Sequence, residues 1–140
     1  MVVSAMIFLA GAMSLFRSVG LRRLPFLAIS LLTALISLAW SVEAITPDLL
    51  AGGLLLFACS RTFAAEWPES RSAQVASGIA WGVGYMAKAV VLPIAVAVTV
   101  LAGLAVARSV RAGRQALRAV GVSLLLTAIT AAPWIATLSL

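Results

Sequence analysis

Histidine is absent from this chain, and cysteine occurs only once, at Cys59. A single cysteine excludes an internal disulfide, and without histidine the chain lacks the commonest side-chain ligand of transition metals. We therefore expect no metal site in the chain, and no cofactor is evident. Acidic residues are also scarce, with four Asp and Glu against ten Lys and Arg, which gives a net charge of +6. The arginines fall between apolar runs and form no patch interleaved with aromatic residues, so we expect no nucleic-acid partner.

Apolar side chains are abundant: 64% of the residues are hydrophobic and 10% are charged. This composition is typical of a membrane protein and not of a soluble domain. The apolar residues gather in six segments, which cover residues 2–16, 25–42, 49–65, 73–87, 89–107 and 119–138. A helix needs about 20 residues to cross the hydrocarbon of a bilayer, so most segments are long enough and two are short. The sequence predicts an all-α, polytopic transmembrane bundle of about six segments in the lipid bilayer, with residues 1–140 as one domain.

Arginines mark alternate connections between these segments. They are Arg17, Arg22 and Arg23, then Arg61 and Arg71, then Arg108, Arg111, Arg114 and Arg118. Because basic residues favour the cytoplasmic side, we expect all three connections to lie there and the chain to thread up and down. The last group recurs at three- and four-residue spacing, which predicts one basic helical face that rests on anionic lipid, or arginines that serve only to fix topology. The opposite connections carry Glu43, Asp48 and Lys88, which places these residues at the outer face.

Lys88 is the only charged residue between positions 73 and 107. One interpretation is an interfacial lysine that extends its ammonium to the headgroups, and the other is a cation that holds an anionic headgroup, most naturally a lipid phosphate. The outer turn before it in the chain contains Thr46, Pro47 and Asp48, which fit a helix N-cap, the first helical position and a carboxylate in the first turn. The same carboxylate is placed to meet a sugar hydroxyl, a metal ion or a lysine.

Small residues indicate how the helices pack. Gly78 and Gly82 have the four-residue spacing that permits close approach between helices. We expect Trp81 and Cys59 to be buried in the core. Arg61 lies near the inner end of its segment, from which it reaches the headgroups, so it needs no gating role.

Three motifs occur in an order and spacing that resemble those of the C superfamily (GT-C) of membrane glycosyltransferases. They are Thr46-Pro47-Asp48, Gly82-Val83-Gly84-Tyr85-Met86-Ala87-Lys88 and Ala132-Pro133-Trp134-Ile135. The similarity is to the relatives of aminoarabinose lipid A transferase and protein O-mannosyltransferase. In these, one helix ends in a glycine-rich stretch with lysine and a later helix carries Pro-Trp. The resemblance covers only an internal portion of such an enzyme, after its first outer loop.

The resemblance implies transfer of a sugar from a polyprenyl-phosphate-linked donor at the outer face of a bacterial inner membrane. Lys88 is carried over as a ligand of the carrier phosphate, Asp48 as a residue lining the cavity, and Tyr85 as a neighbour one helical turn from Lys88. The family's acidic base lies in its first outer loop, and no residue here matches it. We therefore expect a fragment that is inactive alone, with its catalytic residue unknown and a divalent cation compatible with the complete enzyme.

Two other functions remain open. A small transporter or channel subunit would use Asp48 and Lys88 to line a polar path, although polar residues at mid-membrane depth are few beyond serines and threonines. Internal repeats, which are common in transporters, are not evident. A structural membrane protein without catalysis also fits the composition, but it does not explain the three ordered motifs.

Overall fold

A computed structural model describes residues 2–43, 48–109 and 113–138 of the chain. These residues form six helices and no strand. They are α1 (Val2–Ser18), α2 (Arg23–Glu43), α3 (Asp48–Thr62), α4 (Arg71–Ala87), α5 (Val91–Ser109) and α6 (Gly113–Leu138). Each predicted apolar segment corresponds to one helix, so the prediction of an all-α chain is confirmed.

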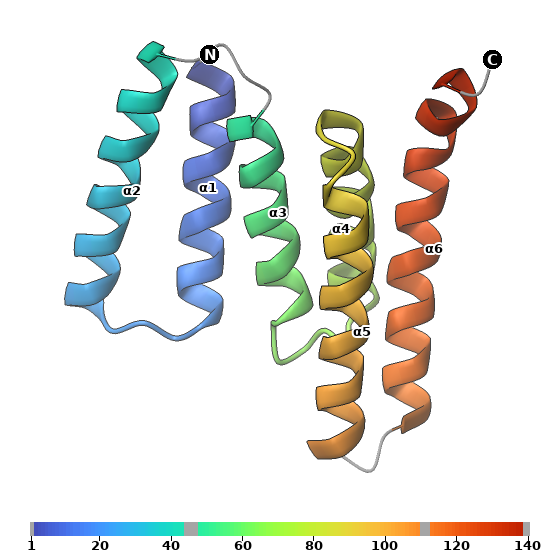
Figure 1. Ribbon diagram of the computed structural model, residues 1–140. Helices are drawn as coiled ribbons and strands as arrows, with labels where there is room; N and C mark the ends of the chain where they lie inside the picture. The colour runs from blue at the N-terminus through green and yellow to red at the C-terminus, as the bar shows by residue number, and fades with distance from the viewer. Residues whose placement is uncertain (1, 44–47, 110–112, 139–140) are drawn as a thin grey trace.

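The helices run alternately up and down (Figure 1). α1 packs between α2 and α3, α3 also packs against α4, and α6 packs against both α4 and α5. This threading brings the first turn of α3, the last turn of α4 and the last turns of α6 to one end of the bundle. The opposite end holds the connections that begin after α1, α3 and α5.

Glycine allows two of these helix pairs to approach closely. A β-carbon at Gly78 of α4 would lie 2.7 Å from the carbonyl oxygen of Ser123 in α6, and one at Gly82 would lie 2.5 Å from Thr130 Cβ. In the α1–α3 pair, a β-carbon at Gly53 would lie 2.5 Å from Phe8 Cα. Distances this short leave no room for a side chain, so the predicted packing role of Gly78 and Gly82 is confirmed.

The described core consists largely of small and hydroxyl-bearing side chains. Buried positions include Ala58, Ala95, Ala119, Ser77, Thr99 and Thr127. Large aliphatic side chains point outward instead: Leu31 and Leu101 are each 64% exposed, and Leu125 is 60% exposed. Trp81 is fully buried and Cys59 nearly so, as predicted. The bundle therefore has small residues between its helices and large apolar residues on its outside.

Two predicted boundaries are wrong. α3 ends at Thr62 and not at residue 65, because the chain turns there and places Trp67 in the core against Ala73, Ala102 and Ala119. α6 begins at Gly113 and not at residue 119. The predicted single basic face is therefore wrong for Arg108, which belongs to α5, whereas Arg114 and Arg118 share α6; Arg111 lies outside the described residues.

Within the described residues, two helices have the length and apolar composition needed to cross a membrane. They are Val91–Arg108 of α5 and Gly113–Thr137 of α6. Shorter apolar stretches cover Val3–Ser18 and Pro25–Ile36. α3 has only 15 residues, or about 22 Å at 1.5 Å per residue, against a hydrocarbon thickness of about 30 Å. The prediction of about six membrane spans is therefore supported only in its coarser form, as an all-helical bundle with two helices of spanning length.

Candidate functional site

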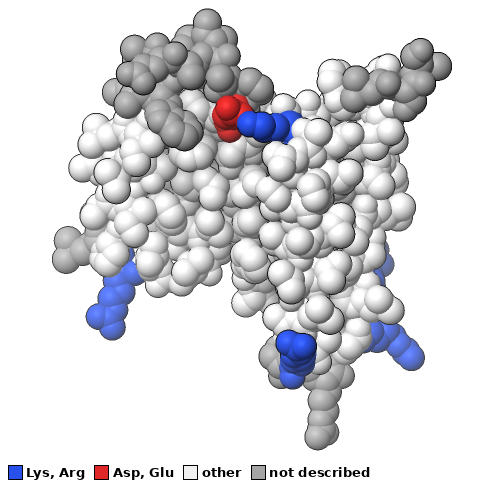
Figure 2. Space-filling view, viewed as in Figure 1, with Lys and Arg blue, Asp and Glu red and all other residues white. Residues whose placement is uncertain are grey.

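Asp48 and Lys88, which are 40 positions apart in the chain, form an ion pair through Asp48 Oδ1 and Lys88 Nζ. The pair joins the first turn of α3 to the residue that follows α4. Figure 2 shows an acidic and a basic side chain in contact at this end of the bundle, and further basic side chains at the opposite end. Two of the three predicted site residues are thus in direct contact.

The start of α3 fixes the position of Asp48. It is the acidic residue of the first helical turn, as predicted, where the partial positive charge of the helix N-terminus favours a carboxylate. The predicted cap, Thr46, and the predicted first helical residue, Pro47, lie outside the described residues. Glu43 ends α2, and its side chain is likewise not described. Asp48 therefore has two stabilising neighbours, the helix terminus and the Lys88 ammonium.

Lys88 stands where the apolar run is interrupted. Its backbone is extended, with φ −156° and ψ 122°, and its N–H donates to the Gly84 carbonyl to close the last turn of α4. Its own carbonyl accepts from the N–H of Val91 at 3.0 Å, which begins α5. The ammonium also lies near the C-terminal end of α4, whose partial negative charge favours a cation. A short turn thus separates two apolar helices and presents one lysine at the end of the bundle.

The ion pair is accessible and weak in energetic terms. The Lys88 and Asp48 side chains are 50% and 43% exposed. Exposed pairs of this kind stabilise a fold by about 0–1 kcal/mol. An ammonium has three N–H donors, and among the described side chains Asp48 accepts one of them, which leaves two for a second anion. An anionic group that approaches Lys88 would share its ammonium with Asp48.

Tyr85 lies in the last turn of α4 and is half-buried. Across the described part of the chain, no hydrogen bond connects it to Asp48 or Lys88, so its role in the site stays a prediction.

Pro133 lies inside α6, and Trp134 is 42% exposed near the end of the same helix. The third motif therefore shares an end of the bundle with Asp48 and Lys88 (Figure 1).

No group of three or more Cys, Asp and Glu side chains gathers in the described ranges as a set of metal ligands. The predicted divalent cation of a complete enzyme stays untested by this arrangement. Asp48 by itself offers one carboxylate, and that carboxylate is already paired with a cation. The chemistry that the site can perform with its described residues is anion binding.

Sequence reasoning missed a buried polar seam between α4 and α6. Trp67 Nε1 donates to Ser123 Oγ at 3.3 Å, Ser77 Oγ lies 3.2 Å from the same oxygen, and Thr127 donates to the carbonyl of Gly78. Serine and threonine at positions 123 and 127 share one helical face, a spacing that would have indicated the seam. These hydroxyl groups satisfy one another and nearby carbonyls, which explains their burial by packing.

Comparison of the chain with family models, curated proteins and solved structures gives no match. The fold and the site by themselves define an all-helical bundle that has small residues inside and an accessible Asp–Lys pair at one end.

Proposed function

We propose that this chain is part of a multi-pass membrane glycosyltransferase, in which Lys88 holds the phosphate of a polyprenyl-phosphate-linked sugar donor at the outer face of a bacterial plasma membrane. The observation that carries the proposal is the contact between Asp48 and Lys88. Two motifs that resemble the GT-C pattern, and that lie 40 positions apart, meet at one accessible point.

The distribution of side chains supports a membrane location. A soluble bundle buries its large aliphatic residues and exposes polar ones. Here the described interior is rich in alanine, glycine, serine and threonine, whereas large residues such as Leu31, Leu101 and Leu125 face outward. Small interfacial residues are typical of transmembrane helix packing, because lipid chains solvate the large apolar side chains and close backbone contacts hold the helices together. In our proposal, lipid surrounds all six helices.

The site chemistry supports phosphate as the ligand group. When a glycosyl group leaves a lipid phosphate, negative charge builds on the departing phosphate oxygen. A fixed ammonium beside that oxygen stabilises the developing charge, and it does so more strongly where water is partly excluded. Lys88 is held by a backbone turn at the end of α4, so its position needs no reorganisation of a helix.

In this proposal Asp48 shares the Lys88 ammonium with the bound phosphate and is not the general base. Its carboxylate accepts a hydrogen bond from the Lys88 ammonium. Asp48 can also rely on the N-terminus of α3 when Lys88 turns toward a phosphate. The general base is assigned to no residue of this chain, and Tyr85 is retained as a neighbour of the bound donor.

Binding of a lipid phosphate tests the proposal. The full chain in neutral detergent would be titrated with a polyprenyl monophosphate and with the uncharged polyprenol of the same length. We expect the wild type to prefer the phosphate, and Lys88→Gln to reduce this preference on the order of tenfold. Arg118→Gln removes one positive charge at the other end of the bundle and should leave the preference unchanged. Equal preference in Lys88→Gln and wild type would contradict the role of Lys88.

The corresponding kinetic test uses a complete, active form of the enzyme. Lys88→Ala should lower sugar transfer at low donor concentration, because the substitution removes the cation proposed to hold the donor phosphate. Unchanged transfer under that condition would exclude a role for Lys88 in the reaction, even where the isolated chain binds the lipid.

A transporter or channel subunit is the alternative. Ser77, Ser123 and Thr127 form a buried polar seam between two of the described helices, which such a function would use. Its hydroxyl groups donate to one another and to carbonyls of α4 and α6. Because these donors are used within the protein, the seam favours helix packing over a solvated path, and the glycosyltransferase remains the better proposal.

A further inference from the structure

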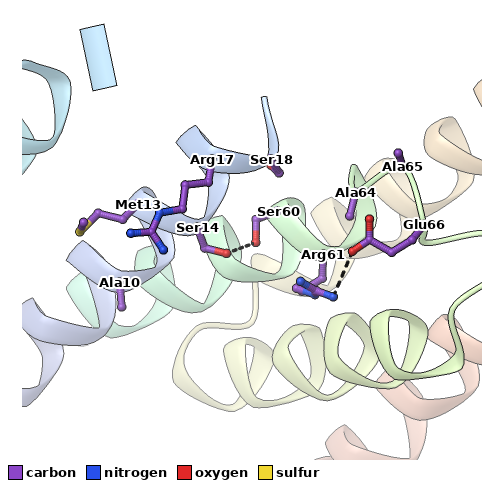
Figure 3. A pocket seen from close by; sticks show the side chains of 10 residues that line it. All are labelled: Ala10, Met13, Ser14, Arg17, Ser18, Ser60, Arg61, Ala64, Ala65 and Glu66. Carbon is purple, nitrogen blue, oxygen red and sulfur yellow. Dashed lines mark hydrogen bonds and ion pairs between the residues drawn. The ribbon is translucent and has the colours of Figure 1, made fainter. Parts of the chain in front are cut away.

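A groove opens at the arginine end of the bundle, between the last turns of α1 and α3 (Figure 3). Its volume is about 690 Å³. Its lining includes Met13, Ser14, Arg17, Ser60, Arg61 and Glu66. We call this feature the arginine groove; it lies at the opposite end of the bundle from Asp48 and Lys88 and is not used by the proposed glycosyltransferase site.

The hydroxyl groups of the groove are already engaged. Ser60 Oγ donates to the carbonyl of Phe57 at 2.7 Å, and Ser18 Oγ donates to the carbonyl of Leu15 at 2.8 Å. Ser14 and Ser60 are joined by a hydrogen bond (Figure 3) with 2.7 Å between their Oγ atoms, and Ser14 is its donor when Ser60 donates to Phe57. The Ser14–Ser60 bond therefore joins α1 to α3, the Ser18 bond stays within α1, and the guanidinium groups are left as the donors available to a ligand.

Arg17 and Arg61 give the groove its charge. Each guanidinium carries five N–H donors in a planar fork that matches two oxygens of a phosphate. Arg61 Nη2 meets Glu66 Oε1 at 3.5 Å, which is longer than the usual 2.7–2.9 Å of a charge-assisted hydrogen bond, so this contact is loose. Arg17 lies 5.7 Å from the centre of the Phe26 ring, a cation–π distance that steadies its side chain without using its N–H groups.

We propose that the arginine groove binds a phosphate group and that an anionic phospholipid supplies it. The two arginines outweigh Glu66, so the groove has a net positive charge. Ala10 and Met13 continue the lining one to two turns into the bundle, alongside the apolar outer faces that would contact acyl chains. A headgroup anion at the helix ends with chains along apolar helices matches this arrangement, whereas a free anion uses only the arginines.

Native mass spectrometry of the full chain, released from neutral detergent, tests this site. The probes are dioleoyl phosphatidylglycerol, dioleoyl phosphatidylcholine and inorganic phosphate. We expect phosphatidylglycerol adducts to exceed phosphatidylcholine adducts. The variant Arg17→Gln/Arg61→Gln should reduce this ratio on the order of tenfold, because two surface arginines near an anionic lipid are lost. The matched control Arg114→Gln/Arg118→Gln removes two arginines from the same end of the bundle, outside the groove, and should keep the ratio.

Glu66→Gln provides a second test, in which the expected result is a gain of lipid binding that misfolding of the variant would not produce. Removal of the competing carboxylate frees Arg61, so phosphatidylglycerol occupancy should rise. No rise in Glu66→Gln, or an equal fall of the ratio in both double variants, would overturn the site. Displacement of phosphatidylglycerol by inorganic phosphate would overturn the lipid as the source, whereas retention of the lipid adduct supports it. None of these outcomes depends on polyprenyl phosphate binding at Lys88.

Discussion

Lys88 has three N–H donors and two neighbours with which to share them, the Asp48 carboxylate and an incoming anion. Removal of the Asp48 charge should therefore strengthen anion binding, provided that the lysine stays in place. Its place is set by backbone hydrogen bonds, from its N–H to Gly84 and from Val91 to its carbonyl, and not by the ion pair. The ion pair acts as a mild competitor for the ligand.

Asp48→Asn is predicted to raise the affinity for a polyprenyl monophosphate by up to about fivefold, because an exposed ion pair contributes at most about 1 kcal/mol. The equilibrium titration used for Lys88→Gln measures the change. The double variant Asp48→Asn/Lys88→Gln is the control and should bind as weakly as Lys88→Gln alone. A fall in affinity in Asp48→Asn would show that the carboxylate contributes directly to the ligand site and is not a competitor.

Sequence reasoning identified Asp48 and Lys88 separately and placed both at the outer end, because alternate arginine-bearing connections fix the direction of each helix. It left a lysine as one of three partners for the Asp48 carboxylate and did not single out the contact with Lys88, which requires α3 and α4 to be neighbours. Adjacency of α3 and α4 depends on packing surfaces such as Gly84 against Leu54, and this pairing has no periodic signal within one helix. The cap residues Thr46 and Pro47 lie outside the described residues, so that part of the motif stays a prediction.

The α4–α6 pair depends on the missing side chain at Gly78. A β-carbon there would meet the carbonyl oxygen of Ser123 at 2.7 Å and Leu126 Cβ at 2.8 Å, and a backbone oxygen cannot move aside as a flexible side chain does. Gly121, on α6, has nothing within 4 Å of the corresponding position. The two glycines thus offer the same substitution in a crowded and in an open environment.

Gly78→Ala is predicted to lower the free energy of unfolding by about 1–3 kcal/mol, because the added methyl group forces the helices apart. Gly121→Ala should leave it unchanged or raise it by up to about 1 kcal/mol, since alanine favours the helix. The difference in the free energy of unfolding is measured by unfolding both variants in the same detergent and monitoring the loss of helix by circular dichroism. Equal loss of stability in the two variants would contradict close approach at Gly78.

Helix boundaries show where pattern reasoning reached its limit. Apolar runs located all six helices because a polar interruption separates each from the next. They placed the end of α3 at residue 65, because alanines 64 and 65 continue the apolar run without belonging to the helix. They also assigned Arg114 and Arg118 to a connection, although both lie in α6. The positions of charged residues therefore predicted where each apolar segment ends better than where each helix ends.

The described charged side chains lie at the two ends of the bundle, and large apolar side chains cover its sides. Arg17 and Arg61 lie in last helical turns at one end, and Asp48 and Lys88 lie at the other. The proposed enzyme requires the end with Asp48 and Lys88 to face outward, because a donor lipid that is used at the outer face must meet Lys88 there. If Lys88 lay on the cytoplasmic side, it could not meet a donor lipid at the outer face. The arginine groove would then lie at the outer face of the membrane.

Cysteine labelling in intact cells measures this orientation. Cys59, which is buried, is replaced by alanine, and single cysteines are placed at Val90, beside Lys88, and at Glu69, between α3 and α4; both positions are exposed. An outer location of Lys88 predicts that Val90→Cys reacts with a membrane-impermeant maleimide before lysis, and that Glu69→Cys reacts only after the membrane is opened. Labelling of Glu69→Cys alone in intact cells, or recovery of the protein in the soluble fraction, would contradict it.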